Sequence, residues 1–189
     1  MKKANYIFIF IILICILIIA FLSYNLYRIK NAHFLLLDKS KMTLTEYDYK
    51  GNEIYHCSIA TGKNPGNKRV KGDCKTPEGV FPIQEILDSK EWKHDFKDDS
   101  LGEIKGAYGN YFIRLNVKNQ KGIGIHGTHD PLSIGKRASE GCIRLKNEDI
   151  NEIALRMKIG EIVIITPGKE DVDENDKFQK DTILKKKNH

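Results

Sequence analysis

Two short segments of the sequence carry residue types that could do nucleophilic chemistry together. One is His126-Gly127-Thr128, and the other runs from Ser139 to Leu145 and contains Cys142. Little of an ordinary cysteine is thiolate at neutral pH, so a nearby imidazole is needed to withdraw its proton and later return it to a leaving amine. This pattern predicts Cys142 as a nucleophile and His126 as its general base and acid.

Residues next to Cys142 have types that could assist such a reaction. Gly141 leaves its backbone amide unobstructed, and that amide together with the amide of Cys142 could stabilise a developing oxyanion. Arg144 lies two residues beyond Cys142, on the same face if the segment is extended. Its guanidinium could hold a carboxylate through two hydrogen bonds, and Lys136 and Arg137 add to a local basic group.

Blander interpretations of the same residues stay open. A lone cysteine between apolar residues is usually a small core residue, and a lone histidine is more often a hydrogen-bonded structural residue. His126, His129 and Cys142 also mimic a zinc ligand set, but a structural site would want a fourth ligand and the sequence has no Cys-x-x-Cys pair. We therefore expect His129 to be a solvated loop residue. Cys57 and Cys74 are expected to be isolated thiols, although they could pair outside the cytoplasm.

Strands must position these residues, because alternating and short apolar runs dominate the chain up to residue 126. They predict strands at 34–37, 42–47, 53–60, 79–83, 111–117 and 122–126. Glycines and prolines in residues 61–79 indicate a long ordered loop. Residues 88–106 form a polar insertion, helical or loop-like, that is a candidate lid.

A helix and a last strand complete the predicted domain. Asn147 is expected to cap a helix whose apolar face consists of Ile150, Ile153, Ala154 and Met157. Residues 161–166 follow as a buried strand. One β-rich domain with one late helix, residues 34–168, accounts for the pattern. The charged, apolar-poor tail 169–189 is expected to be disordered.

The charge of the chain is unevenly distributed. Its 189 residues include 31 Lys or Arg and 25 Asp or Glu, which gives a net charge of +6. Four of these six charges come from residues 1–33, where they flank an apolar segment, so a nucleic-acid partner is not expected. Residues 6–23 could cross a bilayer, because about 20 helical residues span roughly 30 Å.

The apolar segment predicts a single-pass membrane anchor. Residues 1–5 would be its cytoplasmic flank, since they carry Lys2 and Lys3. Residues 24–33 would be a short linker to an extracytoplasmic domain. A cleaved signal peptide is the alternative, but no convincing cleavage site follows Ala20.

Two separated motifs resemble the L,D-transpeptidase catalytic-domain family of the YkuD type. His-Gly-Thr at 126–128 precedes Ser-x-Gly-Cys-x-Arg at 139–144, with a spacing that suits this family. Upstream, Ala60-Thr61-Gly62-Lys63 and the segment from Lys75 to Phe81 are similar to its Thr-Gly and Thr-Pro-x-Gly-x-Phe segments. The resemblance covers nearly the whole β-rich domain. Glu140 departs from the pattern of this family. Some members carry a histidine at this position, so that histidine cannot serve as a second base here.

The resemblance implies a mainly β, sandwich-like domain and a bacterial enzyme that faces the cell wall. Cys142 would attack a peptidoglycan stem tetrapeptide at its third residue, expel D-alanine, and pass the acyl group from a thioester to another stem, forming a 3-3 cross-link. The carbonyl of Gly127 would orient His126. Oxyanion or substrate binding would fall to Gly141, Ser139, Arg144 and Thr128. Carbapenem-type inhibitors are expected to bind, and no metal or organic cofactor is implied.

Two other functions stay open at the level of the sequence. Attack of water on the same thioester would make the protein an L,D-carboxypeptidase, and the motifs do not separate this outcome from transfer. A membrane-tethered module that binds the wall without catalysis is the second alternative.

Overall fold

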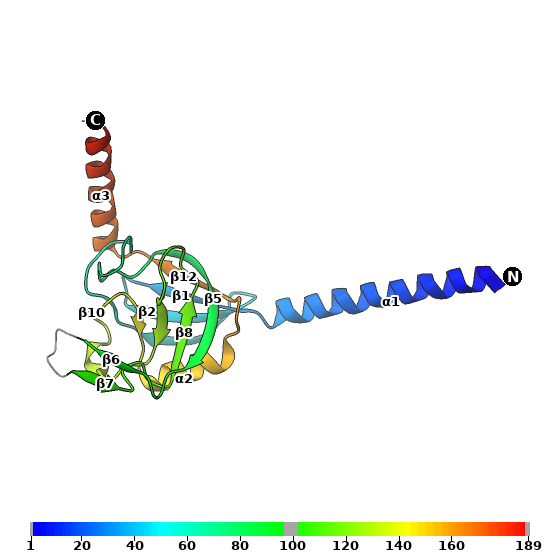
Figure 1. Ribbon diagram of the computed structural model, residues 1–189. Coiled ribbons are helices and arrows are strands. Elements are labelled where there is room, and N and C mark those ends of the chain that lie inside the picture. The colour runs from blue at the N-terminus through cyan, green and yellow to red at the C-terminus, as the bar shows by residue number, and fades with distance from the viewer. Residues whose placement is uncertain (1, 97–101, 188–189) are drawn as a thin grey trace.

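The computed structural model describes residues 2–96 and 102–187, and in Figure 1 two helices project from a body of strands. The main sheet has eight strands in the order β11-β9-β8-β5-β12-β1-β2-β3. The predicted mainly β fold with an N-terminal helix and a late helix is confirmed. In chain order the elements are α1 (Lys2–Lys30), β1 (His33–Asp38), β2 (Thr43–Asp48), β3 (Glu53–Ser58), β4 (Thr61–Gly62), β5 (Gly79–Asp88), β6 (Lys93–Asp95), β7 (Glu103–Lys105), β8 (Tyr111–Leu115), β9 (Gly124–His126), the 3-10 helix η1 (Pro131–Ser133), β10 (Arg137–Ser139), β11 (Ile143–Arg144), α2 (Asn147–Arg156), β12 (Ile162–Thr166) and α3 (Lys169–Lys187).

One long strand, β5, joins the two halves of the main sheet. Its first residues pair with β12 and its later residues, from Ile83 onward, pair with β8, both antiparallel. The register with β8 shifts between Ile83 and Glu85. Such an irregularity bends a strand and increases its twist, so the sheet curls and brings β8, β9 and β11 around one side of the core.

The apolar core is built from the main sheet and α2. The buried face of α2 contains Ile150 and Ile153, both fully buried, at the helical spacing that the sequence predicts. Burial of a side chain of this size contributes about 1.5–3 kcal/mol, so the core fixes both the sheet and the start of α2. The fully buried aliphatic side chains from the strands include Leu35, Leu37, Leu44, Ile113, Ile125, Ile143 and Val163.

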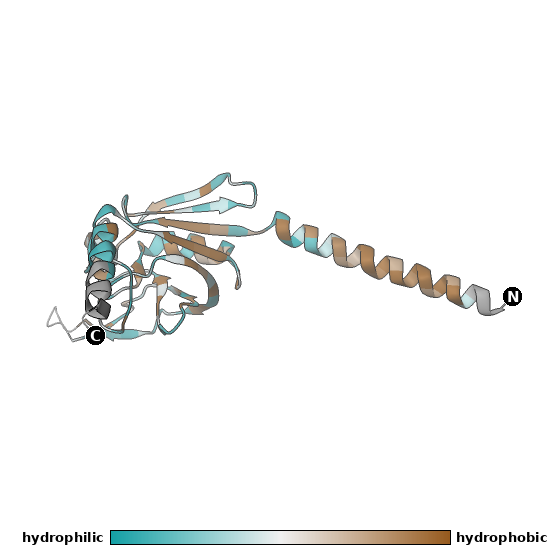
Figure 2. Ribbon diagram, turned by 90° about the horizontal axis from the view of Figure 1, so that it is seen from above, coloured by the Kyte–Doolittle hydropathy of each residue, from teal (hydrophilic) through white to brown (hydrophobic). Residues whose placement is uncertain are grey.

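The N-terminal helix α1 is longer than expected. It continues to Lys30, so most of the expected linker 24–33 is helical instead. Its stretch Tyr6–Lys30 is long and apolar enough to cross a membrane and is not buried against the β domain, and a signal sequence would meet the same criteria. Figure 2 shows hydrophobic residues along most of α1.

The polar insertion 88–106 contains a hairpin rather than a helix or a plain loop. β6 and β7 pair antiparallel, with His94 opposite Ile104. Residues 97–101 of the insertion lie outside the described residues. The hairpin follows the end of β5 and precedes Tyr108, and Figure 1 shows it on the side of the β-rich body that is away from α1.

The structure also differs from the expected disorder of the tail, because α3 spans Lys169–Lys187. Asp171 stabilises its first turn by accepting a hydrogen bond from the backbone N–H of Gly168, at 2.7 Å, as acids near helix starts do. The same carboxylate is fully buried and lies 2.9 Å from Arg137 and 3.3 Å from Lys39. A sequence poor in apolar residues thus folds here through buried polar contacts.

Candidate active site

Two short parallel strands bring Cys142, Arg144 and His126 to one face of the sheet. In the pairing of β9 with β11, Ile143 lies opposite Ile125, and Arg144 lies opposite His126. Both isoleucines are fully buried in the core. Because side chains alternate along a strand, the residues before and after them point to the other face. The nucleophile and base candidates therefore share one side of a two-strand ladder.

His126 is held in one orientation by its neighbours. Its Nδ1 lies 2.6 Å from the carbonyl oxygen of Gly127, which can only accept, so Nδ1 carries the proton and Nε2 remains an acceptor. The ring stacks on Phe112 at 5.4 Å between centroids and meets the edge of Tyr108 at 4.8 Å. Burial lowers the pKa of His126 to about 3, although the Gly127 carbonyl acts in the opposite direction. The imidazole is therefore neutral at physiological pH.

The carbonyl that orients His126 is itself fixed by Asn147. The side-chain oxygen of Asn147 accepts a hydrogen bond from the N–H of Thr128 at 2.9 Å, and a Cβ on Gly127 would collide with that oxygen. The expectation that Asn147 caps α2 is wrong, because Lys146 occupies the N-cap and Asn147 is the first helical residue; its contact with Thr128 had no signal in the sequence. Thr128 is buried, and its hydroxyl exchanges hydrogen bonds with the backbone of Asp130.

Cys142 is half-buried. Its Sγ lies 3.4 Å from the carbonyl oxygen of Gly122. Burial raises the pKa of the Cys142 thiol, and the N–H of Gly124 and the charges of Lys68 and Arg144 only partly offset this. At rest, Cys142 is therefore a thiol and His126 a neutral imidazole, rather than a thiolate and an imidazolium.

A tight turn presents Cys142. The hydroxyl of Ser139 donates to the Cys142 carbonyl at 2.5 Å and accepts from the N–H of Gly141 at 3.1 Å. Gly141 has φ +129°, and a Cβ there would lie 2.8 Å from the carbonyl oxygen of Lys75, so only glycine fits. The hydroxyl of Thr76 donates to the Gly141 carbonyl at 3.0 Å. The long loop before β5 thus holds the turn in place. The N–H of Gly141 already donates a hydrogen bond to Ser139.

Arg144 is 6% exposed as a whole residue, and its guanidinium carbon lies 4.9 Å from the Phe96 ring centroid. Among the described residues it forms no ion pair and donates no side-chain hydrogen bond. Asp130 and Glu140 contribute only longer-range attraction. A desolvated guanidinium without a carboxylate partner is suited to receive one from a ligand.

One known protein family matches most of this chain. The family model described as the L,D-transpeptidase catalytic domain, YkuD, matches residues 32–165. The chain belongs to the L,D-transpeptidase catalytic-domain family. A putative L,D-transpeptidase, YqjB of Bacillus subtilis, is 30% identical over 138 residues, which are 72% of this chain and 68% of that protein. The putative L,D-transpeptidase YkuD of Bacillus licheniformis is 45% identical over 62 residues, 33% of this chain and 36% of its own length.

Solved structures of L,D-transpeptidases have the same fold. The avibactam carbamoyl enzyme of Ldtfm superposes with a TM-score of 0.53 at 19% identity, over 71% of this chain and 49% of that one. L,D-transpeptidase 3 of Mycobacterium tuberculosis with a faropenem-derived adduct gives 0.52 at 19% identity, over 71% and 60%. The helical cell shape determining protein Pgp2 of Campylobacter jejuni, as its K307A mutant, gives 0.53 at 21% identity, over 74% and 48%. The chain thus spans about half the length of some of these relatives.

Several residues around this candidate site carry no signal in the sequence. Tyr108 packs against His126, and burial raises the pKa of its hydroxyl to about 12. Lys68 lies in the loop before β5, pairs with Asp73 at 2.7 Å, and its charge acts on Cys142. His94 reaches the site from β6. None of them stands next to a catalytic motif in the chain, so only the fold brings them together.

The remaining candidates lie around this centre. His129 stacks on Phe96 at 4.8 Å rather than standing alone in solvent. A cavity of about 460 Å³ opens beyond the ends of β9 and β11, lined by Thr128, His129, Pro131, Lys146, Asn147 and Glu148. The part of the chain that the structure describes holds no group of three His, Cys, Asp or Glu residues placed to bind a metal ion. All four cysteines are free thiols, as expected for Cys57 and Cys74.

Proposed function

We propose that this protein is an L,D-transpeptidase that acts on peptidoglycan stem tetrapeptides through a thioester on Cys142. The observation that carries the proposal is the pairing of β9 with β11, which puts Cys142 and His126 on one face. Membership of the family supports the reaction class. The neighbours solved as an avibactam carbamoyl enzyme and as a faropenem-derived adduct support a site that β-lactam-like acylating agents can reach.

The proposed first half-reaction forms the thioester. Nε2 of neutral His126 takes the proton of Cys142 as Sγ attacks the carbonyl carbon of the third stem residue. The backbone N–H of Cys142 is the better oxyanion donor, because Ser139 engages the N–H of Gly141. His126 then gives its proton to the nitrogen of D-alanine, the C–N bond breaks, and D-alanine leaves. Arg144 holds a stem carboxylate.

The second half-reaction transfers the acyl group. The side-chain amine of a second stem attacks the thioester and loses a proton to His126, and the thiolate leaves and is reprotonated by the imidazolium. The product is a 3-3 cross-link, and Cys142 and His126 return to their neutral resting forms. We propose that α1 anchors this domain at the outer face of the cell membrane, where stem peptides are found.

Mass spectrometry of the full chain in detergent tests the site. A carbapenem should add one covalent adduct, on Cys142, which Cys142→Ala abolishes. Cys74→Ala is the matched control and should acylate normally, since Cys74 is a free thiol with no catalytic partner. His126→Ala should slow acylation by at least about 100-fold. Absence of any adduct on folded protein would favour a non-catalytic wall-binding module.

Incubation with disaccharide tetrapeptides tests the reaction. A cross-linked dimer with loss of one D-alanine is expected. Tripeptide as the only product would identify an L,D-carboxypeptidase instead, because water would then be the acceptor of the same thioester.

A further inference from the structure

A chain of hydrogen bonds runs beside the Cys142 and His126 pair, and the proposed mechanism does not use it. The hydroxyl of Tyr108 lies 2.9 Å from Nδ1 of His94, and Nε2 of His94 lies 3.2 Å from a carboxylate oxygen of Glu140. A carboxylate can only accept, so Nε2 carries a proton. Nδ1 then accepts from the Tyr108 hydroxyl when His94 is neutral. All the donors and acceptors match in this arrangement.

One end of this chain of hydrogen bonds packs against His126, and the other end belongs to the turn that carries Cys142. Tyr108 packs edge-on against the ring of His126, with 4.8 Å between centroids. Glu140 stands immediately before Gly141 and Cys142, inside the turn that presents the thiol. His94 therefore connects the wall of the imidazole site with the turn of the thiol, from a strand that is far from both in sequence.

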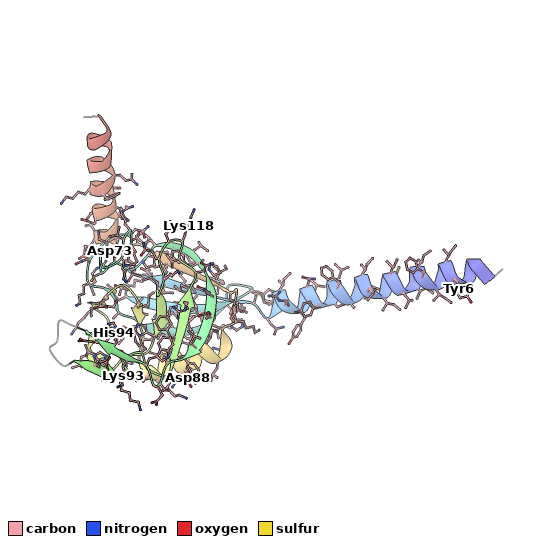
Figure 3. All side chains as sticks on the ribbon, in the orientation of Figure 1. Tyr6, Asp73, Asp88, Lys93, His94 and Lys118 are labelled. Carbon is pink, nitrogen blue, oxygen red and sulfur yellow. The ribbon has the colours of Figure 1, made fainter. Side chains whose placement is uncertain are left out.

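We propose that His94 is a positioning residue for the reaction, on the basis of the proposed function. By bridging Tyr108 and Glu140 it holds the Tyr108 ring against His126 and restrains the turn of Cys142. His94, which is labelled in Figure 3, makes both of these hydrogen bonds from β6, and the flanking residues Trp92 and Phe96 add ring contacts with Tyr108 and His129. Neither reacting atom needs to touch His94.

The exposure of these groups separates this role from a merely structural one. The side chain of His94 is 29% exposed and that of Glu140 is 48% exposed. Hydrogen bonds and ion pairs this open to solvent contribute little to folding. Their loss should therefore leave the melting temperature nearly unchanged while it changes the alignment of the reacting pair, which depends on small displacements.

The experiment compares His94→Ala, Glu140→Ala and the double variant in the full chain in detergent. Lys93→Ala is the matched control. Lys93 precedes His94 on β6, its side chain is 57% exposed, and it pairs only weakly with Glu103, at 3.7 Å. Acylation by a carbapenem is resolved into the half-saturating concentration and the limiting rate. Each single variant should lower the limiting rate about tenfold with little change in half-saturation. The double variant should be no slower than the singles.

The same series includes a variant that should restore part of the acylation rate and results that would contradict the proposal. His94→Gln, whose amide can still donate to Glu140, should recover part of the rate. A wild-type limiting rate in His94→Ala, or effects that multiply in the double variant, would overturn the proposal. The single tryptophan, Trp92, packs at 5.9 Å from Tyr108 and reports by its emission whether the hairpin stays in place.

Alkylation of Cys142 by iodoacetamide separates this proposal from the proposed function, since it needs no stem peptide or carbapenem. If no protein is acylated but His94→Ala slows alkylation of Cys142, the proposed function fails and the positioning role stands. If alkylation is equally fast in wild type and His94→Ala, the positioning role is wrong whatever the acylation shows.

Discussion

At the scale of single residues, burial keeps both reacting groups uncharged. It raises the pKa of the Cys142 thiol and lowers that of His126 to about 3. In the proposed reaction, a proton therefore moves from sulfur to nitrogen during attack rather than before it. The nearby charges of Lys68 and Arg144 favour the thiolate once it forms.

The buried imidazole should make folding stability depend on pH. Unfolded, His126 titrates near 6.5, whereas in the folded protein its pKa is about 3. Between these values the unfolded state binds more protons, so the free energy of unfolding should fall by about 2 kcal/mol from pH 7 to pH 5. Urea titrations of the full chain in detergent at both pH values measure this change.

The variant His126→Asn is the control, because it cannot titrate there and should give a flatter profile. Three carboxylates with shifted pKa values should contribute little to the change in stability between pH 7 and pH 5. Hydrogen bonds and nearby cations hold the pKa of Asp73, Asp38 and Asp171 below the ordinary value against the opposing effect of burial, so their stabilising effect is lost only at lower pH. Parallel profiles of wild type and His126→Asn would contradict the prediction.

Residue types and local spacing were enough to single out Cys142 and His126 as candidates. The sequence also proposed the carbonyl of Gly127 as the group that orients the ring, and the structure has that contact at 2.6 Å. It did not find Asn147 or His94, because their partners are 19 and 46 residues away. Contacts of this kind depend on how strands and helices pack, which no local pattern records.

At the scale of elements, apolar periodicity predicted most strands and α2, since burial selects those patterns directly. It failed for α3, whose folding depends on the buried carboxylate of Asp171. Asp171 also accepts from the N–H of Gly66 at 2.6 Å, in the loop that clamps Gly141 through Thr76. The C-terminal helix is therefore connected to the catalytic turn through a loop of ordered polar contacts.

Asp171→Asn should test this connection. Its buried carboxylate neutralises Arg137 and Lys39, and removal of one partner of a buried ion pair costs roughly 3 kcal/mol. We expect urea titrations to show this loss in the free energy of unfolding. Without urea, acylation of Cys142 should be slower than in wild type. Glu170→Gln is the matched control, because its side chain is 73% exposed and pairs with the same arginine. It should change stability by less than about 0.5 kcal/mol; an equal loss in both variants would remove the special role of Asp171.

At the scale of the whole molecule, the surfaces of the β-rich domain and of α1 are suited to different solvents. The domain buries a core of apolar side chains, whereas those of α1 from Tyr6 onward are exposed, and Figure 2 shows that hydrophobic residues make up most of α1. Four of the six net positive charges of the chain also lie at the ends of α1, outside the domain. A membrane would satisfy both features, because lipid covers the apolar side chains and water the charged ends.

An uncleaved anchor should therefore hold the intact chain, 21.7 kDa, in the membrane fraction after an alkaline carbonate wash. The variant Ile12→Lys/Ile16→Lys should release it, since each lysine at the centre of a span costs about 2.5–3.5 kcal/mol. Asn25→Lys should stay in the membrane, because a lysine near the end of a span can reach the interface. Recovery of a shorter, soluble chain from wild type would show instead that the segment is a cleaved signal peptide, and the enzyme would then act unattached.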